Sequence, residues 1–311
     1  MERGFSMGVF GRIKYDFQRN KLLLLMLLPG LALLIVFKYL PMYGLLISFQ
    51  NYQLFKGFFA SPWVGFKNFQ KFIDDPFFYR LVRNTFLLGL YNMLYTFPAP
   101  IIFAILLNEV RLRKFKRVVQ TVSYIPYFIS TVIIVGLLKS FLSTDQGVIN
   151  NAIVSLGFTK INFFSEPKWF RTIYIGSEIW QGLGYGSILY LAAITGIDQE
   201  LYEASRMDGA TRFQNILHIT IPCLIPTISI LFIMRVGSII SVGFEKVYLM
   251  YSSATYETAD VISTYVYRMG MKSNPNISYA SAVGIMNSIV SLILVWGANT
   301  FSRKFLEESL W

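Results

Sequence analysis

The sequence predicts an all-α membrane protein with six transmembrane helices and a polar helix-turn-helix loop between the fourth and the fifth. Of its 311 residues, 54% are hydrophobic and only 14% are charged, which is too apolar for a soluble domain of this length. The apolar residues form long segments that approach or exceed the roughly 20 residues needed to cross a bilayer. Polar segments separate them, and short runs of cations lie beside several. A single domain covering residues 1–311 is the simplest organisation.

The six segments follow one another without a long repeat or a low-complexity linker. The first one follows a basic head at 1–21 and lacks a small-residue cleavage site, so we expect a retained helix and not a signal peptide. Pro98 and Pro100 lie inside the second segment and predict a kink there. The predicted spans are about 22–49, 81–108, 118–142, 172–195, 221–251 and 280–301.

The distribution of cations predicts the orientation of the chain. Five of the seven residues at 111–117 are Lys or Arg and none is acidic, which places this loop in the cytoplasm together with the basic head. Both termini are then cytoplasmic, and the loops at 50–80, 143–171 and 252–279 are external. Cations such as Lys56 and Lys67 also occur in the external loops, so the orientation depends mainly on the head and on 111–117. We expect a multi-pass membrane protein.

A polar island at 198–222 separates the fourth and fifth predicted spans. Asp198 can cap the start of a first short helix, and Gly209 suits the left-handed position at its end. Thr211 and Gln214 have the spacing of a capping box for a second helix, before Pro222 opens the next span. The island therefore predicts two helices joined by a tight elbow.

Several kinds of chemistry are absent from the sequence. No G-x-x-x-x-G-K-[S/T] phosphate loop is present, so any ATP must be bound by another chain. A single Cys (Cys223) and a single His (His218) give neither a disulfide framework nor a metal cluster, and no catalytic site emerges. The net charge of +11 lies in runs beside the apolar spans, which argues against nucleic acid. We expect neither an enzyme nor a cofactor in this chain.

Ionisable residues within the predicted spans are the first candidates for a solute pathway, because charge in hydrocarbon is costly. Glu178 and Arg235 lie at similar depths in the fourth and fifth spans, so Arg235 either pairs with Glu178 or presents its charge to a solute. Flat aromatic faces beside amides suit sugar rings, and the candidates for such contacts are Trp180, Gln181, Tyr185 and Asn287. Gly182, Gly184 and Gly186 are better explained by close helix packing than by nucleotide binding.

The elbow has a recognisable pattern. Glu203-Ala204-Ser205, three residues, Gly209, nine residues and Ile219-Thr220-Ile221-Pro222 resembles the EAA loop of ABC importer permeases, with Ser205 in place of Ala and Ile221 in place of Leu. The resemblance implies that this loop docks into a cleft of a cytoplasmic ATPase. The residues it assigns to this contact, directly or beside the turn, are Glu203, Ala204, Ser205, Asp208, Gly209 and Ala210.

The rest of the chain resembles the maltose-type, carbohydrate-uptake branch of these permeases. The residues that carry this resemblance are 41–44, 48–49, 52, 64–69, 83–85 and 123–126, and the 40–44 segment is most similar to Gram-positive oligosaccharide permeases that use lipid-anchored binding proteins. The resemblance implies a core permease at 81–301 and an oligosaccharide substrate. It also implies a second six-helix permease, two ATPases that bind ATP and Mg²⁺, and an extracellular binding protein.

Three other functions remain open. A permease for another solute, such as a polyamine, phosphate or an amino acid, would share the elbow. A secondary transporter or channel would need no ATPase contact and is expected to show inverted repeats or broken helices. A membrane scaffold without transport activity would have no use for the elbow.

Overall fold

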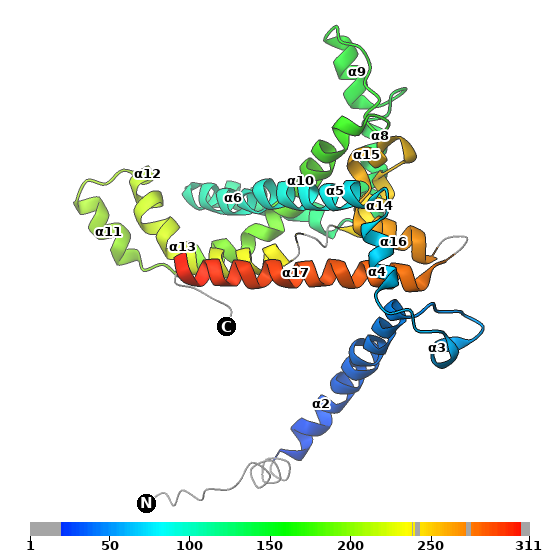
Figure 1. Cartoon of the computed structure of the whole chain (residues 1–311). Coiled ribbons are helices and arrows are strands. Elements are labelled where there is room, and N and C mark those ends of the chain that lie inside the picture. Colours follow the sequence, from blue (N-terminus) through cyan, green and yellow to red (C-terminus); the bar gives the residue numbers. More distant parts are fainter. Residues whose placement is uncertain (1–19, 238, 240–242, 272–274, 306–311) are drawn as a thin grey trace, which may run out of the picture.

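The computed structural model describes residues 20–237, 239, 243–271 and 275–305 (Figure 1). Nearly all of the basic head at 1–21 therefore lies outside the described residues. The described part is helical, and its only β pairing is an isolated bridge between Gln50 and Trp63. The helices are α2 (Lys21–Leu34), η1 (Ile35–Tyr39), η2 (Leu40–Phe49), α3 (Gly57–Ala60), α4 (Lys67–Ile73), α5 (Phe78–Tyr91), η3 (Asn92–Thr96), α6 (Pro98–Glu109), α7 (Arg113–Tyr124), η4 (Ile125–Phe128), α8 (Thr131–Phe141), α9 (Val148–Ser155), α10 (Pro167–Thr195), α11 (Gln199–Met207), α12 (Arg212–Asn215), η5 (Ile216–Thr220), α13 (Ile221–Gly237), α14 (Phe244–Met250), η6 (Ser253–Thr255), α15 (Tyr256–Ala259), α16 (Ile262–Met271) and α17 (Ile277–Phe305).

Four helical runs within the described residues are long and apolar enough to cross a membrane. They are Lys21–Phe49, Phe78–Glu109, Arg212–Gly237 and Ile277–Lys304. A fifth span is possible if Arg113–Phe128 and Thr131–Phe141, which meet at an angle of 101°, are counted together. The 29-residue α10 is not among these candidates, although it corresponds to the fourth predicted helix.

The second predicted helix is confirmed as one continuous run. The π-helical turn η3 immediately precedes Pro98, which lacks the N–H that would continue the regular ladder of hydrogen bonds. The irregular turn is where the chain accommodates this proline, without breaking the run.

The prediction of one helix at 118–142 and one at 221–251 is wrong, because each range contains two helices. In the first, Pro126 lies in the 3-10 turn η4 and the Ser130 side chain accepts a hydrogen bond from the Ile133 N–H, so a new helix starts after it. In the second, α13 ends at Gly237 and α14 begins at Phe244. The sequence did not predict these two breaks because the residues around them are apolar, and hydropathy gives no information about the direction of a helix.

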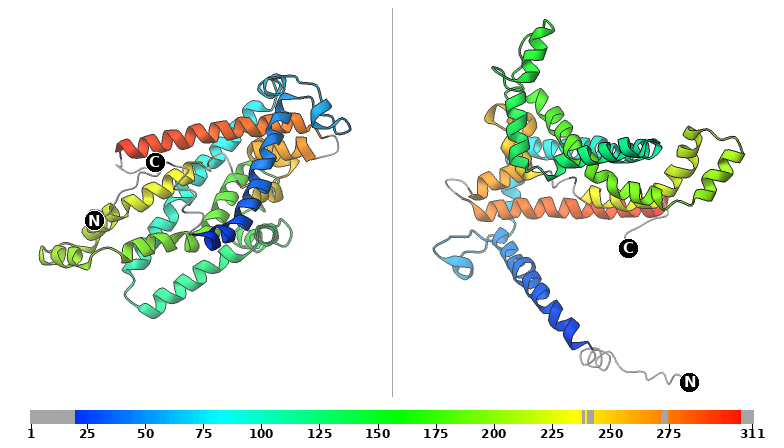
Figure 2. Two further views of the ribbon diagram at one scale, coloured as in Figure 1. Left: turned by 90° about the horizontal axis from the view of Figure 1, so that it is seen from below. Right: turned by 180° about the vertical axis from the view of Figure 1, so that it is seen from behind.

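The long helix α10 lies at the centre of the molecule. It packs on α6, α7, α13 and α15, and α13 packs in turn on α17. Figures 1 and 2 show α5–α6, α13 and α17 running along roughly one direction, with α11 and α12 at one end and α4 and α16 at the other. The two ends of this bundle therefore carry different polar segments, one of which is the elbow.

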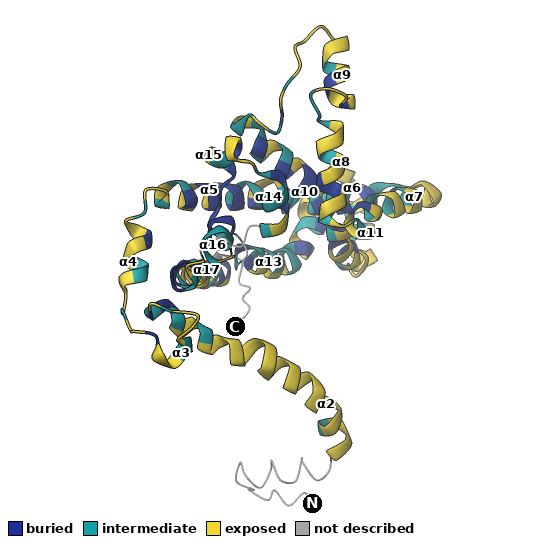
Figure 3. Ribbon diagram, turned by 90° about the vertical axis from the view of Figure 1, so that its right-hand side faces the viewer, coloured by how far each residue is buried: buried dark blue, intermediate teal, exposed yellow. Residues whose placement is uncertain are grey.

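The first helix, α2, stands away from this bundle. None of its residues is buried, and Figure 3 shows it as an exposed rod. Its leucines, such as Leu22 at 75% exposed and Leu23 at 67%, need lipid or another polypeptide to remove them from water.

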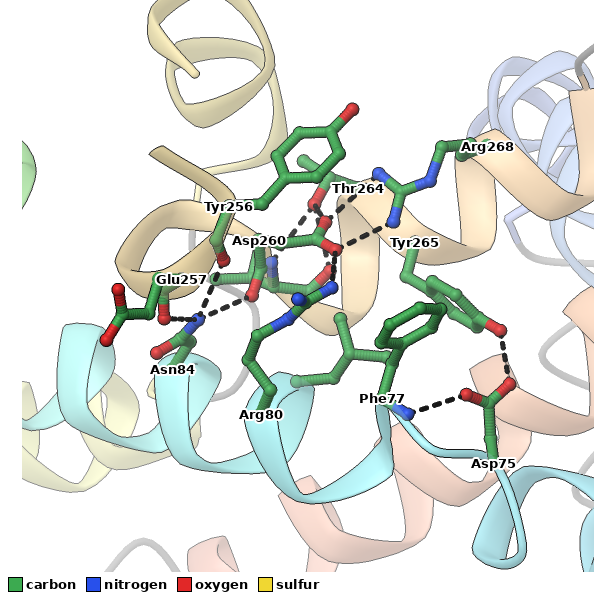
Figure 4. Close-up of polar contacts among 12 residues, drawn as sticks. Asp75, Phe77, Arg80, Asn84, Tyr256, Glu257, Asp260, Thr264, Tyr265 and Arg268 are labelled. Atoms are coloured by element: carbon green, nitrogen blue, oxygen red, sulfur yellow. Dashed lines mark hydrogen bonds and ion pairs between the residues drawn. The ribbon is translucent and has the colours of Figure 1, made fainter. Parts of the chain in front are cut away.

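A buried carboxylate organises the end of the bundle opposite the elbow (Figure 4). Asp260 is fully buried and forms ion pairs with Arg268 at 2.7 Å and Arg80 at 3.5 Å. Thr264 donates a further hydrogen bond to it at 3.0 Å. Asn84 of α5 donates to three backbone carbonyls of the 256–260 segment. The Asp260 cluster thus joins α5, α15 and α16.

A second carboxylate at this end, Asp75, holds α4, α16 and α17 together. Its Oδ2 accepts hydrogen bonds from the Tyr265 hydroxyl at 2.5 Å and the Tyr279 hydroxyl at 2.8 Å, and its Oδ1 accepts one from the Phe77 N–H. Partial burial alone would raise the pKa of Asp75, but these hydrogen bonds outweigh it and hold the pKa below its ordinary value.

The lowered pKa of Asp75 predicts a stability contribution that depends on pH. A carboxyl group with a depressed folded-state pKa stabilises the protein above the unfolded-state pKa of about 4, and this stabilisation is lost as the pH falls through the folded-state value. We expect the thermal midpoint of Asp75→Asn in detergent to lie below that of the wild type at pH 7, and the gap to close towards pH 3. Asp74→Asn, which makes the same substitution at the exposed neighbouring residue, is the matched control variant. A gap of constant size between pH 7 and pH 3 would contradict this prediction.

Candidate functional site: the elbow and the pocket between the helices it connects

The elbow has the local structure that its sequence predicts. The Asp198 side chain caps α11 by accepting a hydrogen bond from the Glu200 N–H at 3.0 Å. Gly209 has a φ of +78°, a left-handed conformation that only glycine adopts without strain. Thr211 and Gln214 form the predicted capping box at the start of α12. All three local predictions are confirmed.

Side-chain hydrogen bonds brace the two arms of the elbow against each other. Ser205 donates to Asn215 Oδ1 at 2.9 Å, and the hydroxyls of Tyr202 and Thr220 lie 2.9 Å apart. Ser205, where the resembled pattern has Ala, is therefore half-buried and turned towards the second arm. Two side-chain hydrogen bonds therefore link the two arms of the elbow.

The outer surface of the elbow combines charge with exposed apolar side chains. Glu203, Ala204, Asp208 and Gly209 are exposed, and Ala210 is half-buried. Two large apolar residues that the sequence analysis did not select, Met207 at 88% and Phe213 at 72%, lie on either side of the turn. Large apolar residues within so polar a segment are the signal that could have identified them. The surface is suited to a protein partner.

A cavity of about 760 Å³ lies between the elbow and the end of α6. Asn108, Glu109 and Arg111 line it from the α6 side, and Tyr202, Arg206 and Arg212 line it from the elbow. The elbow therefore lies at the same end of the bundle as the cationic 111–117 segment.

A second cavity, of about 450 Å³, lies between α6, α10 and α13, and we call it the central pocket. Glu178 and Gln181 line it from α10, Arg235 from α13 and Tyr127 from η4. Since α10 and α13 are the helices that enter and leave the elbow, this pocket is built between the two helices that the elbow connects.

Glu178 pairs with Lys246 and not with Arg235, which corrects the predicted pairing. Lys246 Nζ lies 2.5 Å from Glu178 Oε1 and also donates to Gln181 Oε1 at 2.9 Å. Arg235 donates a hydrogen bond to Asn92 Oδ1. Lys246 was not predicted as a site residue, although it lies within the predicted fifth span and is identifiable there as a cation in an apolar segment.

The four residues predicted for sugar contact do not form one site. Gln181 lines the central pocket, and Tyr185 stacks on its wall residue Tyr127 with ring centroids 3.8 Å apart and planes inclined by 5°. Trp180 is 48% exposed and is not part of the lining. Asn287 lines a separate groove of about 810 Å³ between η2, α16 and α17.

Of the three glycines at 182–186 in α10, two confirm the packing interpretation. A Cβ atom at Gly184 would overlap the backbone of Ser123 in α7, and one at Gly186 would lie 3.1 Å from Pro100. Gly182 has open space around it and lines the central pocket.

Known proteins resemble this chain over nearly its whole length. Protein LplB of Bacillus subtilis (strain 168) is 47% identical over 293 residues, which cover 94% of this chain and 92% of LplB. The polygalacturonan/rhamnogalacturonan transport system permease protein YteP of the same organism is 45% identical, with 94% and 91% covered. A chain in the crystal structure of a bacterial alginate ABC transporter, in complex with an alginate pentasaccharide-bound periplasmic protein, superposes with a TM-score of 0.89 and 42% identity, covering 96% of this chain and 100% of that one.

The family comparison agrees with these similarities. The family described as binding-protein-dependent transport system inner membrane component matches residues 96–307, which include α10, the elbow, the central pocket and α17. With about two thirds of the sequence matched and relatives at 47% and 45% identity, the chain belongs to the family of inner membrane components of binding-protein-dependent transport systems.

Proposed function

We propose that this chain is one of two permease subunits of an ATP-driven importer of oligosaccharides. The observation that carries the proposal is the braced elbow, with its exposed outer surface, joining the two helices that line the central pocket. The relatives named for polygalacturonan, rhamnogalacturonan and alginate transport support a carbohydrate substrate. A second six-helix permease, two ATPases that bind ATP and Mg²⁺, and an extracellular binding lipoprotein complete the proposed assembly.

Six spans fit the dimensions of the helices. Four runs and one bent pair are apolar enough to cross a membrane, and α10 supplies the sixth span, since its 29 residues extend about 43 Å against a hydrocarbon core of about 30 Å. The elbow and Arg111, the first of the cations at 111–117, line one cavity at one end of the bundle, which supports a cytoplasmic position for both segments. Both termini are then cytoplasmic, in a bacterial plasma membrane.

The connection between elbow and pocket gives the proposed transport step. Closure of the ATPases would move the elbow, and its internal hydrogen bonds transmit that movement to α10 and α13 together. Because Glu178 and Arg235 belong to these two helices, the same movement changes the width of the central pocket. Access would then alternate between the two sides of the membrane.

Charge and polarity changes on the outer surface of the elbow are expected to release the ATPase. We expect Glu203→Lys or Met207→Glu to lower the amount of ATPase that co-purifies with the tagged chain in mild detergent by about tenfold or more, the usual effect of altering a central interface residue. The second permease should be retained. Glu166→Lys and Leu156→Glu make the same substitutions far from the elbow and should leave ATPase recovery unchanged.

This experiment separates the proposal from a secondary transporter and from a scaffold, whereas a permease for another solute is separated only by the uptake measurement below. A secondary transporter or a scaffold would purify without an ATPase, with or without these substitutions. Full recovery of the ATPase with both elbow variants would overturn the docking role, and uptake of a labelled oligosaccharide by the reconstituted assembly then tests the substrate class.

A further inference from the structure

Three charged side chains from three helices meet at the central pocket. Glu178 comes from α10, Arg235 from α13 and Lys246 from α14, and only the first two line the cavity. The Lys246 side chain is 4% exposed, against 27% for that of Glu178. The carboxylate is thus accessible from the pocket, while the ammonium group that compensates it lies behind the wall.

The contacts of the Lys246 ammonium group hold it in position next to α10. Its Nζ contacts Glu178 Oε1 at 2.5 Å and Gln181 Oε1 at 2.9 Å, and it lies 6.0 Å from the centre of the Tyr174 ring. An ion pair in a poorly hydrated site persists only where geometry and additional hydrogen bonds offset desolvation, and Gln181 and Tyr174 supply such contacts. Gln181 is itself held, because its Nε2 donates to the Ile129 carbonyl at 3.3 Å.

The charged side chains described at this pocket are one carboxylate and two cations. Lys246 cancels the charge of Glu178, and Arg235 adds one more cation to the lining. The Arg235 guanidinium is oriented by a hydrogen bond to the neutral side chain of Asn92, so that contact does not remove its charge. A guanidinium presents five N–H donors in a planar fork that matches a carboxylate.

The rest of the lining suits the neutral part of a sugar. Gln181 offers an amide, and Tyr127 brings an aromatic ring to the wall, stacked on Tyr185. The volume of about 450 Å³ is within the usual range of about 300–1,000 Å³ for small-ligand pockets.

We propose that the central pocket selects acidic saccharides, with Arg235 binding the sugar carboxylate. Lys246 acts as a positioning residue: it neutralises Glu178 from behind the wall and thereby prevents repulsion of the incoming carboxylate. This inference rests on the proposed function, because it names the substrate class of the same importer.

The test compares two forms of one substrate in the reconstituted importer. Proteoliposomes that contain this chain, its partner subunits and the binding protein are given a uronic-acid trisaccharide, or the same trisaccharide with its carboxyls reduced to alcohols. The same binding protein serves every variant, so its own preference cancels between variants. The readout is the ratio of acidic to reduced uptake, which a purely structural defect does not change.

Removing the Arg235 charge is expected to lower this ratio by about 10- to 100-fold, the usual effect of losing a hydrogen bond to a charged group. Arg235→Gln makes this change. Arg235→Lys keeps the charge but loses the planar fork, and should retain part of the preference. The exposed Lys139→Gln is the control for charge removal elsewhere. Equal loss of both substrates in Arg235→Gln would overturn the inference.

The role of Lys246 is tested through Glu178. Lys246→Gln leaves the Glu178 carboxylate uncompensated and should lower the ratio, whereas the double variant Glu178→Gln, Lys246→Gln removes both charges and should restore it. A ratio that stays low in the double variant would contradict charge compensation. If the wild-type importer moves neither trisaccharide, the proposed function fails. If it moves them but Arg235→Gln has the same ratio of acidic to reduced uptake as the wild type, only the present inference fails.

Discussion

Asp260→Ala should destabilise the fold more than any other single removal of a charge in the described part of the chain. The carboxylate is fully buried between Arg80 and Arg268, and the substitution leaves both guanidinium groups without it. Removing one partner of a buried ion pair costs about 3–5 kcal/mol. Since the side chains of Arg80 and Arg268 are 31% and 19% exposed and can be partly hydrated, we expect the lower end of that range.

The measurement is the thermal midpoint of the purified chain in detergent, which should fall by on the order of 5–10 °C. The exposed Asp145→Ala removes the same charge from another loop and should leave the midpoint unchanged. Asp260→Asn keeps the shape of the side chain, and its thermal midpoint should lie between those of Asp260→Ala and Asp145→Ala. An Asp260→Ala midpoint within about a degree of the wild type would show that α5, α15 and α16 do not depend on this carboxylate.

The elbow could be predicted from sequence because its structure is determined locally. Asp198, Gly209 and Thr211 each act within three or four residues of their own position, through a cap, a left-handed turn and a capping box. Such short-range rules need no knowledge of the rest of the fold. The exposure of Met207 was not predicted, since which face of α11 remains uncovered depends on the bundle around it.

The positions of the two helix breaks could not be predicted from hydropathy, because hydropathy measures how well a segment dissolves in lipid and not the direction of its helix axis. The chain turns by 101° after Phe128 and leaves α13 at Gly237, and both breaks lie in segments that remain apolar throughout. Lys246 was missed for the same reason, because the prediction placed it near the end of a continuous helix. The structure instead places it on the separate helix α14, which packs against α10 and brings the ammonium to Glu178.

The Asp260 cluster was also beyond sequence reasoning. Its members come from α5 and from the 256–268 segment, more than 170 positions away along the chain, and in the sequence their charges do not differ from those of an ordinary polar loop. For Gly184, the sequence predicted close helix packing but not the partner in that contact. The spacing of small residues indicates close packing, but which glycine makes the contact, and with which helix, depends on the three-dimensional arrangement.

Gly184→Ala is expected to destabilise the chain, whereas Gly182→Ala, two residues away in the same helix, is not. Both substitutions favour the helix by about 1 kcal/mol, since alanine has the higher helix propensity. At Gly182 the new methyl group meets open space, whereas at Gly184 it overlaps the Ser123 backbone, which cannot rotate away. Overpacking costs about 1–3 kcal/mol even where side chains can adjust, so we expect a net loss of about 2 kcal/mol or more at Gly184.

Thermal midpoints of the two variants in detergent measure this difference directly. The displacement of α7 from α10 also has a functional consequence, because η4 follows α7 and its Tyr127 stacks on Tyr185 of α10 at the wall of the central pocket. Gly184→Ala should therefore impair uptake even at temperatures where the chain stays folded. Gly182→Ala is the reference for the thermal midpoint and not for uptake, because Gly182 lines the central pocket. Equal midpoints would mean that α7 can move away from α10 without cost, and the close approach at Ser123 would then not be what fixes this wall of the pocket.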